Sequence, residues 1–287
     1  MDRLASPLLL LFASLGAQAA ETVNRHDWQK CFDAKGVKGT FVLYQPAKER
    51  YSVLDEARAR QRFLPASTFK IPNALIGLEV GSITDENELF RWDGKPKRMP
   101  AWEQDHTLDT GMRDSVVWMF QQVARRTGRA QMKEWLERLD YGNHDISGGI
   151  DLFWLQGGLR ISAVEQVQFL HKLAEGRLPA TQRSQRLVRN ALVVEKTRDY
   201  TLYAKTGTMD SGRNAINWWV GWVERKGRVA AVFALNLEPV ARTVYADRLE
   251  IGRAILRAEG VLPAAEPGSD RGTTRPPSVA SAAPHAT

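Results

Sequence analysis

The chain has 287 residues, 43% of them hydrophobic and 25% charged, which is the composition of a globular protein with one large domain or two closely packed lobes. Its formal net charge of +7 would suit nucleic acid or a membrane surface, but the basic residues are scattered among 33 acidic ones, so we expect a solvated surface and no nucleic-acid partner. Cys31 is the only cysteine, which excludes an intramolecular disulfide, and the five histidines show no metal-binding spacing.

The first 19 residues have the pattern of a secretory signal peptide. Residues 8–15 are apolar but too few to span a bilayer, and Ala17-Gln18-Ala19 supplies the small residues of a cleavage site. We therefore predict an exported protein that is cut at this point. The weak positive charge at the very start leaves an uncleaved anchor as the alternative. No later run is long and apolar enough to span a membrane, so we expect no membrane contact after cleavage.

Segments typical of β-strands lie near both ends of the remaining chain. Residues 39–44 and 50–54 are rich in β-branched and aromatic residues and are separated by a turn, which predicts a hairpin. Three later segments joined by short turns predict an antiparallel meander, namely 201–205, 217–223 and 228–235.

Helical patterns fill the middle of the chain and also close it. One helix is expected to begin after Ser162, where Glu165 three residues later completes a capping box. The expected helices cover residues 27–34, 67–78, 116–126, 130–139, 163–174 and 242–258. Residues 263–287 are rich in Pro, Ser, Ala and Gly, and we expect a disordered tail there.

This order of elements predicts an α/β fold of the α+β type. Strands at both ends indicate one antiparallel sheet with flanking helices, built from residues of about 20–65 and 196–262. A mostly helical lobe over residues 66–195 is inserted between these two segments. Residues 20–262 are therefore expected to form one domain, with its functional site in the cleft between sheet and helical lobe.

Two polar residues interrupt the predicted buried helix that begins near residue 67. Ser67 and Lys70 are three positions apart, so their side chains project from one face about a turn apart. Burial lowers the pKa of a lysine and can leave a neutral amine that accepts the serine proton, which would make Ser67 a nucleophile. The ordinary alternative is that Ser67 caps the helix and Lys70 reaches the surface. The spacing alone favours this alternative.

Two further motifs change that balance. Lys205-Thr206-Gly207 ends a predicted strand, where Gly207 has no side chain to obstruct a ligand. Ser115 precedes two valines, the second being Val117, at the start of a predicted helix, which alone would indicate only a helix cap. Serine enzymes that are acylated by β-lactams combine Ser-x-x-Lys with Lys-Thr-Gly. The pair of motifs therefore indicates an acyl-serine enzyme.

Together with Tyr141-Gly142-Asn143, residues 147–155 and residues 218–223, these motifs resemble the class D serine β-lactamases, the oxacillinases, over roughly residues 25–262. The resemblance implies hydrolysis of β-lactam antibiotics through a serine acyl-enzyme, and hence resistance to these drugs. It implies that the enzyme binds no prosthetic group. It also implies that carbon dioxide, supplied as such or as bicarbonate, carbamylates Lys70. A class A enzyme would show Ser-Asp-Asn and Glu-x-x-Leu-Asn, and neither is present.

The resemblance also implies catalytic roles. Ser67 would attack the lactam carbonyl, and Lys70, as N6-carboxylysine, would be the general base for acylation and deacylation. Ser115 would pass a proton to the lactam nitrogen. Trp154 would hydrogen-bond the carbamate. The apolar pocket around this group would be formed by Phe69, Val117, Phe120, Trp154 and Leu155.

The remaining motif positions are expected to bind the substrate. They are Val117, Lys205, Thr206, Gly207, Thr208 and Arg248. The backbone N–H groups of Ser67 and Thr208 would form the oxyanion hole. A guanidinium suits the substrate carboxylate, although Arg248 could instead be an exposed helix residue.

Two rival functions share part of the motif set. A β-lactam sensor domain follows transmembrane helices, and this chain has only a short signal-like run. A cell-wall transpeptidase commonly has asparagine where this chain has Val117. The resemblance further implies an enzyme of the periplasm of a Gram-negative bacterium, a monomer or homodimer whose partners are β-lactam small molecules. The range of β-lactams it accepts is left open by the sequence.

Overall fold

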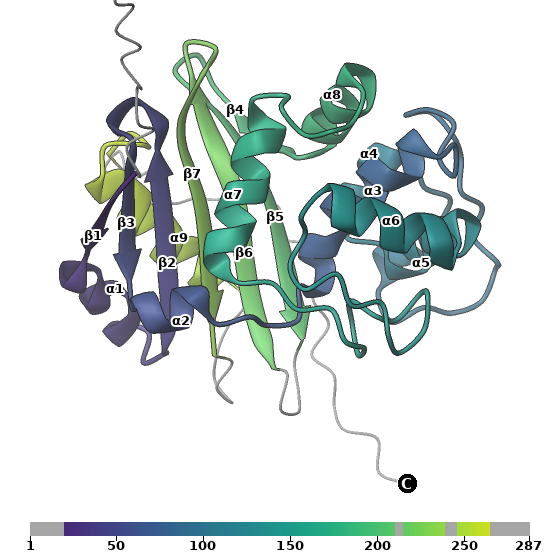
Figure 1. Cartoon of the computed structure of the whole chain (residues 1–287), viewed down its shortest axis with the longest axis horizontal. Coiled ribbons are helices and arrows are strands. Elements are labelled where there is room, and N and C mark those ends of the chain that lie inside the picture. Colours follow the sequence, from purple (N-terminus) through teal and green to yellow (C-terminus); the bar gives the residue numbers. More distant parts are fainter. Residues whose placement is uncertain (1–19, 210–214, 239–245, 265–287) are drawn as a thin grey trace, which may run out of the picture.

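The computed structural model describes residues 20–209, 215–238 and 246–264 (Figure 1). The predicted signal peptide and residues 265–287 of the predicted tail lie outside these residues. Within the described ranges, no helix is long and apolar enough to cross a membrane.

Within the same ranges, seven strands form one sheet in the order β1-β3-β2-β7-β6-β5-β4. The strands are β1 (Glu21–Asn24), β2 (Gly39–Gln45), β3 (Arg50–Leu54), β4 (Val193–Lys196), β5 (Thr201–Met209), β6 (Ile216–Arg225) and β7 (Arg228–Leu237). The N-terminal strand β2 pairs antiparallel with the C-terminal strand β7, so the prediction that both ends build a single sheet is confirmed. The sheet is not wholly antiparallel, because β1 runs parallel to β3 at one edge.

Helices cover both faces of the sheet (Figure 1). Helix α7 (Ala163–Ala174) lies across one face, and helix α9 (Asp247–Ala258) lies behind the other with α1 (Gln29–Asp33). Successive residues of β6 alternate between these layers: Trp218 packs in the layer with α7, and Trp219 packs in the layer with α9. Both faces of β6 are therefore buried, which explains its nearly continuous run of apolar residues.

Most of the other helices form the lobe beside the sheet (Figure 1). The α-helices besides α1, α7 and α9 are α2 (Glu56–Arg60), which lies by the sheet, and α3 (Lys70–Glu79), α4 (Leu108–Arg113), α5 (Val117–Thr127), α6 (Arg129–Arg138) and α8 (Gln182–Ala191). Short 3-10 helices occur in both parts of the fold, namely η1 (His26–Trp28), η2 (Pro46–Lys48), η3 (Ala66–Phe69) and η4 (Pro100–Trp102). The predicted capping box of α7 is confirmed, since the Ser162 hydroxyl accepts from the Glu165 N–H and the Ser162 N–H donates to the Glu165 carboxylate.

Candidate active site

Ser67 lies on a turn that the surrounding chain holds in place. It is half-buried within η3, which leads directly into α3. The preceding residue, Ala66, has a φ of 49°, a left-handed conformation that costs a non-glycine residue about 1–2 kcal/mol. The Ala66 N–H donates to the Trp154 carbonyl at 3.1 Å, and the Thr68 hydroxyl donates to the Pro65 carbonyl at 2.8 Å. These two bonds fix the backbone on both sides of the Ser67 hydroxyl.

Lys70 is completely buried, with its amine beside this hydroxyl. Its Nζ lies 2.8 Å from the Oγ of Ser67 and 5.6 Å from the centre of the Phe120 ring. Burial lowers the pKa of the Lys70 amine well below its usual value, and the positive charge of Lys205 lowers it further. A neutral amine can accept the Ser67 proton. The alternative of a lysine that reaches the surface does not fit a side chain with no exposed area.

Two polar groups in the segments around Lys70 are buried and unpaired. The indole N–H of Trp154 and the Oδ1 of Asn73 have no hydrogen-bond partner among the residues that the structure describes. The Trp154 ring is stacked on Phe69, with 5.1 Å between ring centres. A buried unpaired donor costs about 1–3 kcal/mol, so the Trp154 N–H is suited to an acceptor other than the described residues.

Asn73 is a residue of this pocket that the sequence analysis missed. Its side-chain amide donates to the Phe120 carbonyl at 3.0 Å and so holds the aromatic wall that faces Lys70. Its position three residues after Lys70 was the available signal, since such residues share a helix face.

A second hydroxyl–amine pair lies next to the first. Ser115 is half-buried at the turn before α5, and Lys205 on β5 donates to its Oγ at 3.0 Å and to the Thr206 carbonyl at 3.1 Å. Burial lowers the pKa of Lys205 to about 7, and the positive charge of Arg248 contributes to the shift. Lys205 can therefore change its charge near neutral pH.

Gly207 allows β5 to lie against the Ser67 turn. A Cβ at this position would lie 2.9 Å from the Pro65 carbonyl oxygen and 3.2 Å from the Thr68 nitrogen, which is too close for a side chain against backbone. The absence of a side chain therefore brings the Lys-Thr-Gly segment beside the Ser-x-x-Lys segment.

Arg248 reaches the same segment from α9. Its Nη1 donates to the Gly207 carbonyl at 3.2 Å, the Thr208 hydroxyl at 2.6 Å and Oδ1 of Asn217 at 3.3 Å. The residue is only 6% exposed, which does not fit the alternative of an exposed helix arginine. Asn217 carries no signal in the sequence, because its contact with Arg248 depends on the pairing of β6 with β5, which places it opposite Thr208.

The structure thus gathers most of the predicted site residues in one place, from η3, α3, the start of α5, β5 and α9. Val117 is the half-buried first residue of α5, two positions after Ser115, and Leu155 packs half-buried against the core. A serine beside a buried amine whose pKa is lowered, with cationic groups nearby, is suited to acyl transfer on an anionic substrate. Among the described residues, no group of three His, Cys, Asp or Glu side chains could hold a metal ion.

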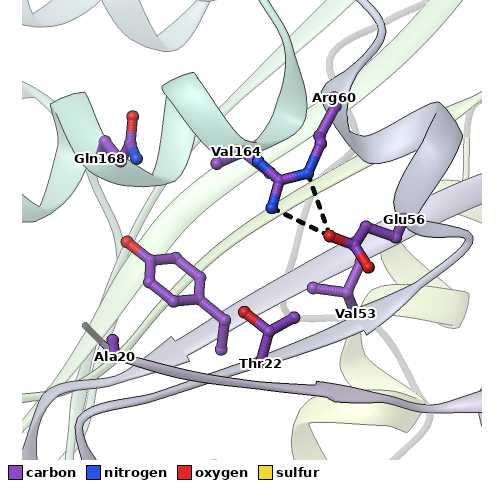
Figure 2. Close-up of a pocket in the computed structure, with 8 residues that line it drawn as sticks. Ala20, Thr22, Val53, Glu56, Arg60, Val164 and Gln168 are labelled. Carbon is purple, nitrogen blue, oxygen red and sulfur yellow. Dashed lines mark hydrogen bonds and ion pairs between the residues drawn. The ribbon is translucent and has the colours of Figure 1, made fainter. Parts of the chain in front are cut away.

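A pocket of about 200 Å³ lies elsewhere, between the β1–β3 edge of the sheet, α2 and α7 (Figure 2). It is lined by Ala20, Thr22, Tyr51, Val53, Glu56, Arg60, Val164 and Gln168. Its charged pair, Glu56 and Arg60, is a solvent-exposed bridge one helical turn apart. None of the residues gathered around Ser67 lines this pocket, so it is separate from the candidate active site.

Comparisons with known proteins give a consistent result. Residues 38–257 match the family described as "Penicillin binding protein transpeptidase domain". The chain is 42% identical over 265 residues to the β-lactamase OXA-10 of Pseudomonas aeruginosa, covering 91% of this chain and 99% of that protein. It is 41% identical over 260 residues to the β-lactamase OXA-48 of Klebsiella pneumoniae, covering 90% and 98%. The crystal structure of FUS-1 (OXA-85), a class D β-lactamase from Fusobacterium nucleatum subsp. polymorphum, matches with a TM-score of 0.80 and 36% identity, covering 83% of this chain and 99% of that one.

Proposed function

The chain belongs to the class D serine β-lactamases, which hydrolyse β-lactam antibiotics, and we propose that it does so with Ser67 as nucleophile and carbamylated Lys70 as general base. The observation that carries this assignment is the 2.8 Å approach of the Lys70 amine to the Ser67 hydroxyl inside a pocket that excludes water from the amine. Such a pair activates a serine without a histidine.

The acylation step follows from the positions of two hydroxyls. The base at position 70 takes the proton of Ser67 as the serine Oγ bonds to the lactam carbonyl carbon, and the developing oxyanion accepts from the N–H groups of Ser67 and Thr208. The lactam C–N bond then breaks, and Ser115, which Lys205 contacts at 3.0 Å, relays this proton to the lactam nitrogen. Water later attacks the acyl carbon and gives a proton to the base at position 70, and the bond between this carbon and the Ser67 Oγ breaks as Oγ takes the proton back.

The residues around Lys70 fit a carbamate. Carbon dioxide reacts only with a neutral amine, and burial lowers the pKa of Lys70 in the required direction. The Trp154 ring stacks on Phe69, the residue before Lys70, and its unpaired N–H is proposed to donate to an oxygen of the carbamate. When it is formed, the carbamate supplies an oxygen base that an unmodified amine lacks.

The substrate carboxylate is proposed to bind at the cationic side of the site. Lys205 and Arg248 provide the positive charge, and Thr206 and Thr208 provide hydroxyl donors. Because Gly207 lets β5 lie against the Ser67 turn, Lys205 and Thr206 come beside Ser67, and Val117 is proposed to contact the substrate from the start of α5.

We also propose that residues 1–19 direct export to the periplasm of a Gram-negative bacterium and that residues 20–262 form the catalytic domain. The apolar run and small-residue triplet of the sequence support this proposal. Determination of the N-terminal residue of the exported protein tests it, since an intact N-terminus would favour the uncleaved anchor.

The function is tested by hydrolysis of a penicillin in the presence of bicarbonate, followed by the intact mass of the protein. We expect sustained turnover that is lost in Ser67→Ala. A covalent adduct of one penicillin that accumulates without turnover would contradict the hydrolase assignment and would indicate the sensor or transpeptidase alternative.

Lys205 predicts an alkaline limit on substrate capture. Burial, with the positive charge of Arg248, lowers the pKa of Lys205 to about 7. An anion nearby, whether a substrate carboxylate or a carbamate on Lys70, raises the pKa of an ammonium. We therefore expect kcat/KM to fall as the pH rises above the pKa of Lys205 in the free enzyme, which is 7 or higher. The fall in kcat should come at still higher pH, because kcat reports the enzyme with substrate bound. Lys205→Arg, which stays charged, should be slower but should lose this fall in kcat/KM. An unchanged fall in Lys205→Arg would assign the titration to another group.

A further inference from the structure

Ser115 occupies a backbone conformation that its neighbours have to maintain. Its φ is 57°, in the left-handed region, and a non-glycine residue there costs about 1–2 kcal/mol. Such conformations persist only where the surrounding structure over-determines them. The hydroxyl of Ser115 points at Lys205 from this turn, so the contacts that hold the turn also set the distance of 3.0 Å between the two groups.

Two indole hydrogen bonds tie the loop containing η4 across this turn. The Trp102 Nε1–H donates to the carbonyl of Asp114, the residue before Ser115, at 2.9 Å. In the opposite direction, the Trp118 Nε1–H on α5 donates to the Trp102 carbonyl at 3.0 Å. The turn is therefore held from the same loop on both its entering and its leaving side.

A buried histidine fixes the other side of the loop. His106 has no exposed area, and its Nε2 lies 3.0 Å from the Ala101 carbonyl while its Nδ1 lies 3.1 Å from the Thr110 hydroxyl. A carbonyl only accepts, so the proton is on Nε2 and Nδ1 accepts from Thr110. Burial lowers the pKa of His106, which keeps this neutral tautomer. The loop is thus anchored to α4 independently of the two indoles.

We propose that Trp102 is a positioning residue for Ser115, holding the Asp114 carbonyl and with it the turn that directs the Ser115 hydroxyl toward Lys205. This inference rests on the proposed role of Ser115 in proton transfer. The other function open to Trp102 is that of a cleft wall that contacts the side chain of the substrate. The two functions differ in which substrates and which kinetic constants respond to loss of the indole N–H.

Trp102→Phe keeps an aromatic ring and removes the N–H donor together with part of the volume of the indole. With a penicillin nucleus that carries no acyl side chain, we expect kcat and the acylation rate to fall about tenfold with KM little changed, because misplacement of a reacting group affects the rate more than binding. Trp92→Phe is the matched control, since the Trp92 indole N–H donates to the Lys95 carbonyl at 2.8 Å in an exposed loop. We expect this control to keep the unmodified rate.

A double-mutant cycle with Ser115→Ala shows whether Trp102 acts through Ser115. If it does, Trp102→Phe slows the Ser115→Ala enzyme no further. A full additional tenfold loss in that background, or an unchanged rate in Trp102→Phe alone, overturns the inference. Should Trp102→Phe not fold, Trp118→Phe, which frees the same loop, enters the cycle in its place. If Ser115→Ala is acylated slowly and Trp102→Phe at the normal rate, only the positioning role of Trp102 is refuted. If Ser115→Ala is itself acylated at the normal rate, the proposed role of Ser115 is refuted as well.

Discussion

Lys70→Ala is expected to lower penicillin turnover by about a thousandfold or more, within the range by which positioned general bases accelerate reactions. The substitution removes the group that lies 2.8 Å from the Ser67 hydroxyl, and no histidine is among the contacts described for Ser67 that could replace it. Acylation and deacylation should both slow, because the same group is proposed to serve both. Rapid mixing with intact mass measurement separates the two steps.

The fold should tolerate Lys70→Ala, because a buried amine with a lowered pKa reduces the stability of the folded protein below its ordinary pKa. The pKa of Lys70 is lower in the folded protein than its ordinary value of 10.5, so between these two values the unfolded chain binds a proton that the folded chain does not. The free energy of unfolding contributed by this site therefore rises with pH through that window and is lowest below it. In buffer without carbon dioxide, Lys70→Ala should lose this part of the slope, which thermal unfolding at several pH values measures.

Lys133→Ala is the matched control for loss of a lysine. Lys133 is a partly exposed residue of α6 that pairs with Glu137, and exposed pairs of this kind contribute only about 0–1 kcal/mol. We expect this variant to keep normal turnover. Substantial turnover by Lys70→Ala, with the control unchanged, would show that another group acts as the base.

The longer elements of this fold could be predicted from the sequence, and the shortest ones could not. The α7 helix carries its own start signal in Ser162 and Glu165, so local pattern sufficed. The edge strands β1 and β4 each have four residues, and their pairing with β3 and β5 rather than their own sequence defines them. The sequence pattern places residues 193–195 in the mostly helical lobe, whereas they belong to strand β4 at the edge of the sheet.

The same distinction applies to the candidate site. Ser67, Lys70 and Lys205 could be proposed from the sequence because they belong to the motifs Ser-x-x-Lys and Lys-Thr-Gly, whose chemistry is known. The contacts of Trp102 and Asn73 could not, since each donates to a backbone carbonyl distant in the chain, and a carbonyl carries no sequence signature. The residues that position the site are therefore visible only once the fold brings the segments together.

Trp154→Phe is expected to make the enzyme dependent on added bicarbonate. Phenylalanine keeps an aromatic ring beside Phe69 but removes the indole N–H that is buried without a partner among the described residues. Loss of a hydrogen bond to a charged group costs about 1.5–3 kcal/mol, which corresponds to roughly 10- to 150-fold weaker binding of carbon dioxide. Without bicarbonate, we expect turnover to fall by up to that factor, and with bicarbonate in excess to recover in part by mass action. Trp154→Ala should also lose much activity, but it adds a core cavity that costs about 3–5 kcal/mol.

A measurement other than turnover distinguishes the carbamate from simple packing. After incubation with ¹³C-labelled bicarbonate, the enzyme without substitutions should show the NMR signal of a carbamate carbon. Trp154→Phe should show this signal only at a higher concentration of bicarbonate. Trp28→Phe is the control, since Trp28 is equally buried but lies in the core layer on the α9 side of the sheet. We expect that variant to be unaffected by bicarbonate. Full activity and an unchanged labelling curve in Trp154→Phe would contradict the carbamate account, because the donor that is proposed to hold the group would then be dispensable.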